Sequence, residues 1–229
     1  AYKELLPSSG PVRTQVVGAS TPDVEMQSQR VQEFMNFQIM NVMDEYDPEM
    51  DRLLFYLPLA GSAFKKVYFD DMLDRAVSKF VPADDLLVPY NATDLSSASR
   101  VTHVIRMNTN DVRKNQAAGF YRDIDILAYD DDDEVRQKER ELQGIEQGGG
   151  DNQDCTLLEI HTDLDLPGFE HVSPIDGEET GIKLPYIVTV DEGSSKVLAI
   201  RRNWREGDEY YKKMQYFSHY KFLPGLGFY

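Results

Sequence analysis

The sequence predicts an α+β fold, with N-terminal amphipathic helices followed by a hairpin and a mostly antiparallel β-meander. Apolar residues recur at helical spacing over residues 21–60, and segments rich in Val, Phe and Tyr follow from residue 64. The helices come first and the strands later, without the βαβ alternation of a parallel sheet. A chain of 229 residues can bury a core without help from a metal or disulfide.

We expect three stretches along the chain. Residues 1–20 hold prolines and glycines among small polar residues, which predicts an extended lead-in segment. Residues 21–150 are expected to form the helical and hairpin part. Residues 151–229 are expected to form the β-meander part.

Two helices open the second stretch. Thr21-Pro22-Asp23 supplies an N-cap, a first-turn proline and a first-turn acid. One apolar stripe follows at helical spacing: Val24, Val31, Phe34, Met35, Val42, Met43 and Tyr46. Asp47-Pro48 then restarts a helix, with Asp47 as its cap, that Pro58 and Gly61 should end. Its expected buried side is Met50, Leu53, Leu54 and Leu57.

The remaining elements are expected to be mostly strands. A hairpin is predicted from residues 64–69 and 75–81, joined by residues 70–74. A short helix should run from Thr109 to Gly119. Further strands are expected at 86–90, 101–107, 156–166, 184–190, 196–202 and 214–220. The charged segment 123–146 predicts an exposed helix at best, followed by a flexible joint at 148–151.

The charge is strongly negative but uneven. The formal net charge is -16, although residues 196–229 carry seven basic and three acidic side chains. This balance argues against tight nucleic-acid binding by the chain as a whole, which would need many phosphate-neutralising cations. The basic C-terminal segment could meet either phosphate or a neighbouring subunit of opposite sign. Cys155 is the single cysteine, which excludes an intramolecular disulfide, and no apolar run approaches the length of a membrane span.

Asp123 and Asp125 begin a pattern that resembles a calcium-binding loop. An EF-hand needs an oxygen ligand and a glycine at its fifth and sixth positions, where this chain has Leu127 and Ala128. The motif therefore fails, and the acidic run at 130–133 predicts a solvated loop.

A second candidate for metal chemistry lies within the segment 156–166. Its alternate residues Glu159, His161, Asp163 and Asp165 should share one face of a strand, where an imidazole and carboxylates could hold a divalent metal. The other face is mainly apolar: Leu158, Ile160, Leu164 and Leu166. A half-buried strand with its polar face outward explains the same pattern, and we favour that interpretation.

The other reactive side chains lack a catalytic context. His103, His171 and His219 have no partners at ligand spacing, and Cys155 has none that marks a nucleophile. The sequence contains no nucleophile elbow, Walker-type loop or dinucleotide fingerprint. We therefore predict a non-enzymatic protein without catalytic, cofactor-binding or metal-binding residues.

Aromatic residues alternate with the basic ones near the C-terminus. They are Trp204, Tyr210, Tyr211, Tyr216, Phe217, Tyr220 and Phe222. Such a mixture can stack on single-stranded nucleic acid. It is also typical of protein–protein interfaces, which we favour here.

Extended stretches resemble the portal proteins of tailed phages, particularly short-tailed ones. Residues 51–90, DRLLFYLPLAGSAFKKVYFDDMLDRAVSKFVPADDLLVPY, are similar to the helix, small-residue turn, hairpin and "vPaeDl.vpy" segment of that family. The stretches TGIKLPYIVTVDEGSSKVLAIRRNW and YFSHYKFLPGLGFY also resemble it. The resemblance covers about three quarters of the chain and rests on extended similarity without an invariant motif.

The resemblance implies a structural subunit of the portal ring. Such a ring of identical subunits, usually a dodecamer, forms the capsid vertex for packaging and ejecting double-stranded DNA and docks terminase, capsid and tail or adaptor proteins. The chain would be the wing-like body preceding the stem, located in the virion and, during assembly, in the host cytoplasm. The alternatives are a metal-dependent hydrolase using the His161/Asp163/Asp165 face and an accessory phage protein or other ring-forming adaptor.

Overall fold

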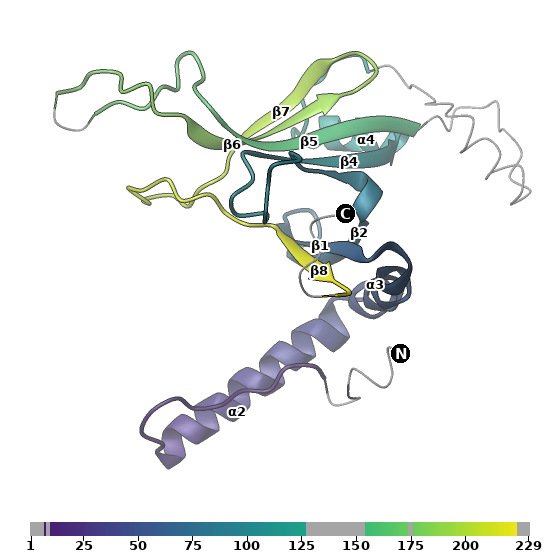
Figure 1. The fold of residues 1–229 in the computed structure, drawn as a ribbon, viewed down its shortest axis with the longest axis vertical. Helices are drawn as coiled ribbons and strands as arrows, with labels where there is room; N and C mark the ends of the chain where they lie inside the picture. Colours follow the sequence, from purple (N-terminus) through teal and green to yellow (C-terminus); the bar gives the residue numbers. More distant parts are fainter. Residues whose placement is uncertain (1–6, 8–9, 127–153, 174–175, 224–229) are drawn as a thin grey trace, which may run out of the picture. The chain divides into compact units, whose positions relative to one another are not determined.

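The computed structural model describes residues 7, 10–126, 154–173 and 176–223 (Figure 1). It confirms the α+β fold, with helices first and two antiparallel sheets after them. The chain divides into two compact units: unit 1 is Ala1–Asp84 with Gln215–Tyr229, and unit 2 is Asp85–Met214. The exposed helix and glycine joint predicted after residue 126 lie outside the described residues.

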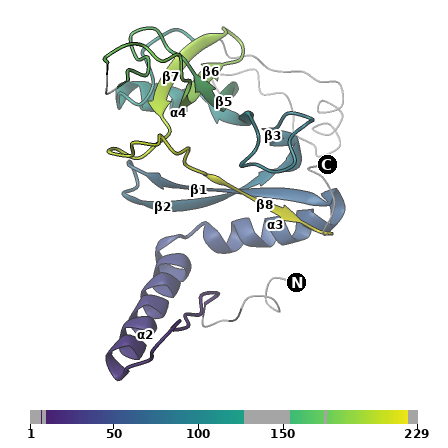
Figure 2. The same cartoon turned by 60° about the vertical axis from the view of Figure 1, so that its left-hand side comes forward.

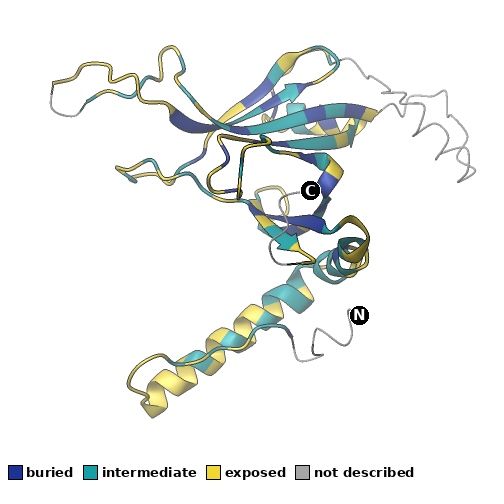
Figure 3. Cartoon of the chain, viewed as in Figure 1, coloured by how far each residue is buried: buried dark blue, intermediate teal, exposed yellow. Residues whose placement is uncertain are grey.

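Helix α2, Pro22–Phe37, begins as predicted. The Thr21 side chain accepts a hydrogen bond from the Val24 amide at 3.4 Å, and Pro22 occupies the first turn. A π-helical turn, Gln38–Val42, continues it. None of the side chains of α2 is buried, and Figure 3 shows the helix in the colours of exposed and intermediate residues.

The lead-in runs alongside the polar side of α2 (Figure 1). The Val12 amide donates to Asn36 Oδ1 at 2.9 Å, and Asn36 Nδ2 donates to the Val12 carbonyl at 3.0 Å. The Thr14 amide donates to Gln32 Oε1 at 3.1 Å. Gly10 adopts a φ of 99° next to Asn36, where a Cβ would lie 2.3 Å from Asn36 Oδ1. Polar contacts therefore hold the lead-in against the helix.

Helix α3, Tyr46–Ala60, ends at Gly61 as predicted, with a left-handed φ of 75°. Two details of the prediction were wrong. The N-cap is Glu45 instead of Asp47, and Pro58 lies inside the helix instead of ending it. A proline within the last turn removes only one intrahelical hydrogen bond, which the rest of the helix tolerates. Leu53 is fully buried, as expected.

The sheet of unit 1 has the strand order β2-β1-β8. The predicted hairpin is confirmed as β1, Ser62–Asp70, and β2, Arg75–Pro82. Strand β8, Phe217–Lys221, pairs antiparallel with β1, so its predicted place in the later meander was wrong. α3 packs on one face of this sheet (Figure 2), where the rings of Tyr56 and Phe80 meet at 5.4 Å.

Unit 2 contains a sheet in the order β3-β4-β5-β6-β7, and each neighbouring pair is antiparallel. The meander prediction is confirmed for its first three strands, at 156–166, 184–190 and 196–202, which are consecutive neighbours in this sheet. The bounds are β3 Leu86–Leu87, β4 Arg100–Asn108, β5 Asp154–Leu164, β6 Leu184–Asp191 and β7 Lys196–Arg202. β3 is shorter than the predicted segment 86–90.

Helix α4, Thr109–Ala117, covers part of one face of this sheet. Its Asn108 cap accepts from the Asn110 amide at 2.8 Å. The buried core below it contains Val112, Tyr121, Cys155, Leu157, Leu198 and Ala199. In the part of the chain that the structure describes, no helix is long and apolar enough to cross a membrane.

Candidate interaction surfaces

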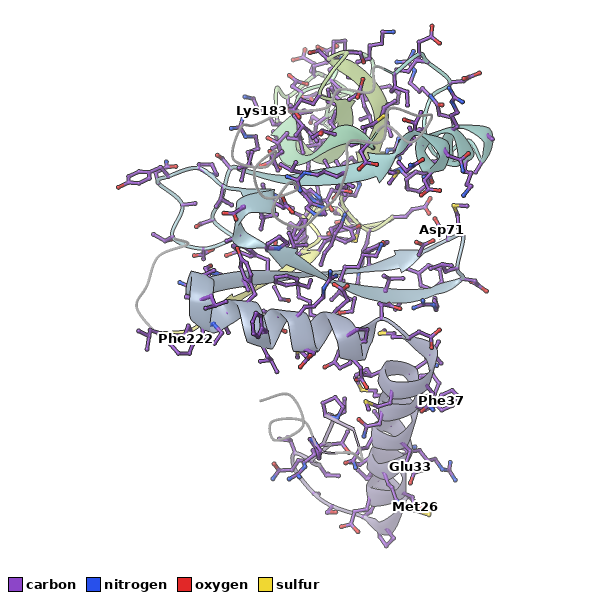
Figure 4. The ribbon with its side chains drawn as sticks, turned by 90° about the vertical axis from the view of Figure 1, so that its right-hand side faces the viewer. Met26, Glu33, Phe37, Asp71, Lys183 and Phe222 are labelled. Carbon is purple, nitrogen blue, oxygen red and sulfur yellow. The ribbon has the colours of Figure 1, made fainter. Side chains whose placement is uncertain are left out.

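The apolar stripe of α2 is exposed. Phe34, in the middle of it, is 62% exposed. The other members of this α2 apolar face are Val24, Met26, Val31, Met35 and Phe37, all of them exposed. In Figure 4, Met26, Glu33 and Phe37 lie along one side of the helix and the lead-in lies on the other. The lead-in thus covers the polar side of α2 and leaves the apolar side to solvent, which marks the apolar side as an interaction surface.

The surroundings of this face are acidic. Residues 22–52 carry eight acidic and two basic side chains. Two of the acidic side chains serve the fold: Glu45 pairs with Arg75 at 2.7 Å, and Glu49 accepts from the Phe80 amide at 2.7 Å. Asp44 and Asp51 are exposed. Exposed carboxylates therefore follow the apolar face along the chain, between the π-helical turn and the second turn of α3, and we call Asp44 and Asp51 the acidic border.

The pKa of Glu45 shows how firmly that carboxylate is held. Burial raises this pKa, but hydrogen bonds from its own backbone and from Arg75 and Ser78 outweigh the burial. The net result is a pKa below the ordinary glutamate value. The Glu45 carboxylate is therefore held at the start of α3 by Arg75 and Ser78, and we do not count it as part of an interaction surface.

A second surface lies in unit 2, at the end of β7. We call residues 201–213 the aromatic–basic turn, because they contain five basic and three acidic side chains together with Trp204, Tyr210 and Tyr211. The Trp204 ring meets Tyr211 at 5.5 Å and Tyr186 at 5.3 Å, and His171 meets Tyr211 at 5.1 Å. These edge-to-face contacts give the turn a rigid aromatic base.

Asp208 fixes the backbone of this turn. Its carboxylate accepts from the Tyr210 amide at 3.1 Å and from the Lys212 amide at 3.0 Å. Gly207 next to it has a φ of 80°, which favours glycine. The phenol ring of Tyr210 is thereby presented to solvent, at 90% exposure.

The aromatic residues singled out near the C-terminus do not all lie in one unit. Trp204, Tyr210 and Tyr211 belong to unit 2, whereas residues 216–222 belong to unit 1. Phe217 is buried in β8. Within the aromatic–basic turn, Arg202 lies 5.8 Å from the Trp204 ring and Arg205 is exposed.

The candidate metal face on β5 is arranged differently from the prediction. His161 is only 3% exposed, whereas Asp163 and Asp165 are exposed. The prediction that this whole polar face points outward was wrong. Cys155 and Leu157, which share the face of His161, pack in the core below α4. His161 tolerates burial because its Nε2 lies 2.8 Å from Glu159 Oε1.

Other candidates from the sequence lie apart from one another. Among the described residues, no group of three or more His, Cys, Asp and Glu side chains could hold a metal ion. Asp123 and Asp125 are exposed, and the Asp125 carbonyl accepts from Lys196 Nζ at 3.0 Å. Residues 127, 128 and 130–133 lie outside the described residues. Cys155 is buried, with its Sγ 3.6 Å from Thr109 Oγ1.

The three remaining histidines have structural neighbours. His103 lies opposite Glu159 in the pairing of β4 with β5. His171 Nδ1 lies 2.7 Å from Thr180 Oγ1. His219 Nε2 lies 2.7 Å from Ser62 Oγ, and its ring stacks on Phe64 at 4.6 Å. Burial lowers the pKa of His219 to about 4.

Lys65 is a notable residue that sequence reasoning missed. It is 3% exposed, and its Nζ lies 3.9 Å from the centre of the Tyr46 ring. Burial lowers its pKa to about 8, although Glu49 and Glu45 oppose this change. A lysine in a strand ordinarily indicates an exposed position, so no local signal identified it.

No protein-family model matches the chain, and a search of curated proteins gives no match.

Proposed function

We propose that the chain is a structural subunit of the portal ring of a tailed phage, part of the vertex through which double-stranded DNA is packaged and ejected. The observation that carries the proposal is the exposed α2 apolar face. Six large apolar side chains stand in solvent there while the polar side of the same helix is covered by the lead-in. Burial of such a face against a neighbouring subunit would remove this apolar area from water.

The charge of the chain supports the same proposal. A net charge of -16 opposes tight binding to a polyanion. A conduit benefits from this property, since DNA must slide along it and every strong Lys or Arg contact would slow it. The resemblance of residues 51–90 to portal proteins gives the proposal its specific form.

The proposed partners follow from this role. They are identical subunits, with a dodecamer as the expected ring, and the terminase, capsid and tail or adaptor proteins that meet at the vertex. DNA would pass without sequence-specific contacts, and no membrane would be involved. The proposed location is the capsid vertex of the virion, with the host cytoplasm as the site of assembly.

A ring with a central channel is the direct test. Electron microscopy of the natural full-length polypeptide should show closed rings wide enough for duplex DNA. Sedimentation velocity across a hundredfold range of concentration should show the corresponding oligomer. A polypeptide that stays monomeric at every concentration would refute the proposal, and rings without a channel would favour an accessory adaptor instead.

The alternative proposal is a metal-dependent hydrolase at the β5 face. Its favouring observation is the Glu159–His161 contact at 2.8 Å, because a carboxylate commonly orients a catalytic or ligating imidazole. Calorimetric titration with Zn²⁺ or Mn²⁺ tests it, with Asp163→Asn/Asp165→Asn as the comparison. One stoichiometric site that disappears in this variant would support the hydrolase and count against the portal proposal.

A further inference from the structure

We propose that the α2 apolar face and its acidic border bind the aromatic–basic turn of a second copy of this chain. This inference rests on the proposed function, since it names the surfaces through which neighbouring subunits of a ring would meet. It concerns one surface in unit 1 and one in unit 2, so each copy would offer both. The contact would be heterologous, which is the kind that closes into rings.

The apolar part of the contact is matched in chemistry. The α2 apolar face offers Phe34, Met35 and Phe37, whose flexible or flat side chains pack well against aromatic rings. The aromatic–basic turn offers Tyr210 at 90% exposure on a base formed by Trp204 and Tyr211. Tyr, Trp and Arg are the residues most enriched among the energetically dominant residues of interfaces.

The charges of the two surfaces are complementary. Residues 22–52 carry a net charge of -6, and residues 201–213 carry +2. One acid of the turn, Asp208, is occupied by backbone amides, which leaves five basic side chains against the exposed Glu206 and Glu209. The neighbouring loop 165–182 is acidic, which confines the cationic surface to the turn itself. Opposite charges at the edge of an apolar contact fix its orientation and speed association.

The same charges argue against a lipid surface as the occupant of the α2 face. Amphipathic helices that bind membranes usually carry Lys and Arg on their polar side, which attract anionic headgroups. α2 has Arg30 as its basic residue, against Asp23, Glu25 and Glu33, and further acids follow it. A basic and aromatic protein surface is the better match.

Two charge-reversed variants test the pairing. The first is Asp44→Lys/Asp51→Lys on the acidic border, and the second is Arg205→Glu/Lys212→Glu on the turn. All four side chains are exposed, so folding should be unaffected. Each variant of the natural full-length polypeptide, alone, should assemble about tenfold or more weakly than the unmodified one, because like charges then face each other.

Mixing the two variants should restore assembly. If subunits of the two variants alternate around the ring, the lysines on the border of the first variant face the glutamates on the turn of the second. The unmodified border of the second variant then faces the unmodified turn of the first. Mass photometry of each variant alone and of the equimolar mixture measures this directly. The matched control pair is Asp71→Lys and Arg113→Glu, exposed charges outside both surfaces, which should assemble like the unmodified polypeptide alone or mixed.

The apolar part of the contact has its own test. Phe34→Ala should weaken assembly by about tenfold or more, as expected for a residue central to an interface. Phe69→Ala removes an equally exposed ring from β1 and should leave assembly unchanged.

The outcomes separate this inference from the proposed function. Rings that form equally well from both reversed variants would overturn the pairing while leaving the portal proposal intact. Failure of the mixture to assemble, when each variant alone also fails, would likewise overturn it. An unmodified polypeptide that never assembles would overturn both proposals together.

Discussion

Replacement of His219 by phenylalanine should remove part of the acid sensitivity of unit 1. The imidazole lies between Phe64, on which it stacks at 4.6 Å, and Ser62, whose Oγ is 2.7 Å from its Nε2. Burial, with a smaller contribution from the positive charge of Lys221, lowers its pKa from 6.5 to about 4. The folded chain therefore holds this side chain neutral at pH values where the unfolded chain protonates it.

The sign and size of the effect follow from that difference. Between about pH 6.5 and pH 4 the unfolded state binds a proton that the folded state does not, so stability falls as the pH falls. At about 1.4 kcal/mol per pH unit, the full difference sets an upper limit of about 3–4 kcal/mol. We expect about 2 kcal/mol, because the ring is only partly buried and solvent screens the charge.

Urea unfolding, followed by circular dichroism at about pH 7 and about pH 4.5, measures the effect. Acidic side chains also lose favourable interactions over this range, but they do so equally in the unmodified chain and in His219→Phe. The unmodified chain should therefore lose about 2 kcal/mol more than the variant. Equal losses within about 0.5 kcal/mol would refute the reasoning, as would an imidazole signal of His219 that titrates near 6.5 in NMR spectra.

Three further substitutions test the packing of unit 1. Gly10→Ala should detach the lead-in from α2, because the φ of residue 10 is 99° and the new Cβ would clash with the Asn36 side chain. Faster hydrogen exchange of the amides of residues 12–14 would show the detachment, and unchanged exchange would contradict it. Leu53→Ala should cost about 2–5 kcal/mol in urea unfolding, since Leu53 is fully buried; a loss below about 1 kcal/mol would mean that α3 packs loosely. Between about pH 8 and 10.5 the unfolded chain holds a proton that folded Lys65 has released, so the stability of the unmodified chain should rise with pH. Lys65→Met should remove this rise, and an unchanged pH profile would argue against the burial of Lys65.

Local signals predicted much of the fold correctly. Thr21 caps α2, and Gly61 ends α3 with a positive φ, because each residue type meets a backbone requirement within its own few positions. The turn of the β1–β2 hairpin is similar, since Asp70 Oδ1 accepts from the Met72 amide at 2.9 Å. These features depend on neighbours in sequence, which a single chain displays.

The pairing of β8 with β1 could not be predicted in this way. Phe64 and His219 lie opposite each other although 155 positions separate them in the chain. The alternation of residues 214–220 indicated a strand but carried no information about its partner. The nearest preceding strand was the default choice, and a long-range pairing overrode it.

The predicted orientation of β5 was wrong for a different reason. Leu157 and Cys155 share a face with His161, whereas the predicted orientation rested on Leu158, Ile160, Leu164 and Leu166, which lie on the other face. Both faces hold apolar residues, so alternation alone is ambiguous. Packing of Val112 from α4 decides which face is inward, and the Glu159 contact makes the buried imidazole acceptable.

The functional surfaces were predicted in composition but not in exposure. The helical spacing around Phe34 indicated an apolar stripe, which in an ordinary domain faces the core. In the structure the apolar side chains of α2 are exposed to solvent, and the lead-in covers the polar side of the helix, where it forms hydrogen bonds with Asn36. Only tertiary structure distinguishes a core stripe from a docking stripe, because the sequence pattern is the same.

The β1–β8 pairing also has a consequence for how the protein is made. Unit 2 is inserted between the two segments of unit 1, so a ribosome releases all of Asp85–Met214 before it releases the last strand of unit 1. During that interval β1 has β2 on one side and an open edge on the other, which is prone to wrong pairing with other chains. Rapid folding of unit 2 would bring the two segments of unit 1 together and shorten the period of risk. Slow translation or truncation before residue 217 should therefore promote aggregation of nascent chains.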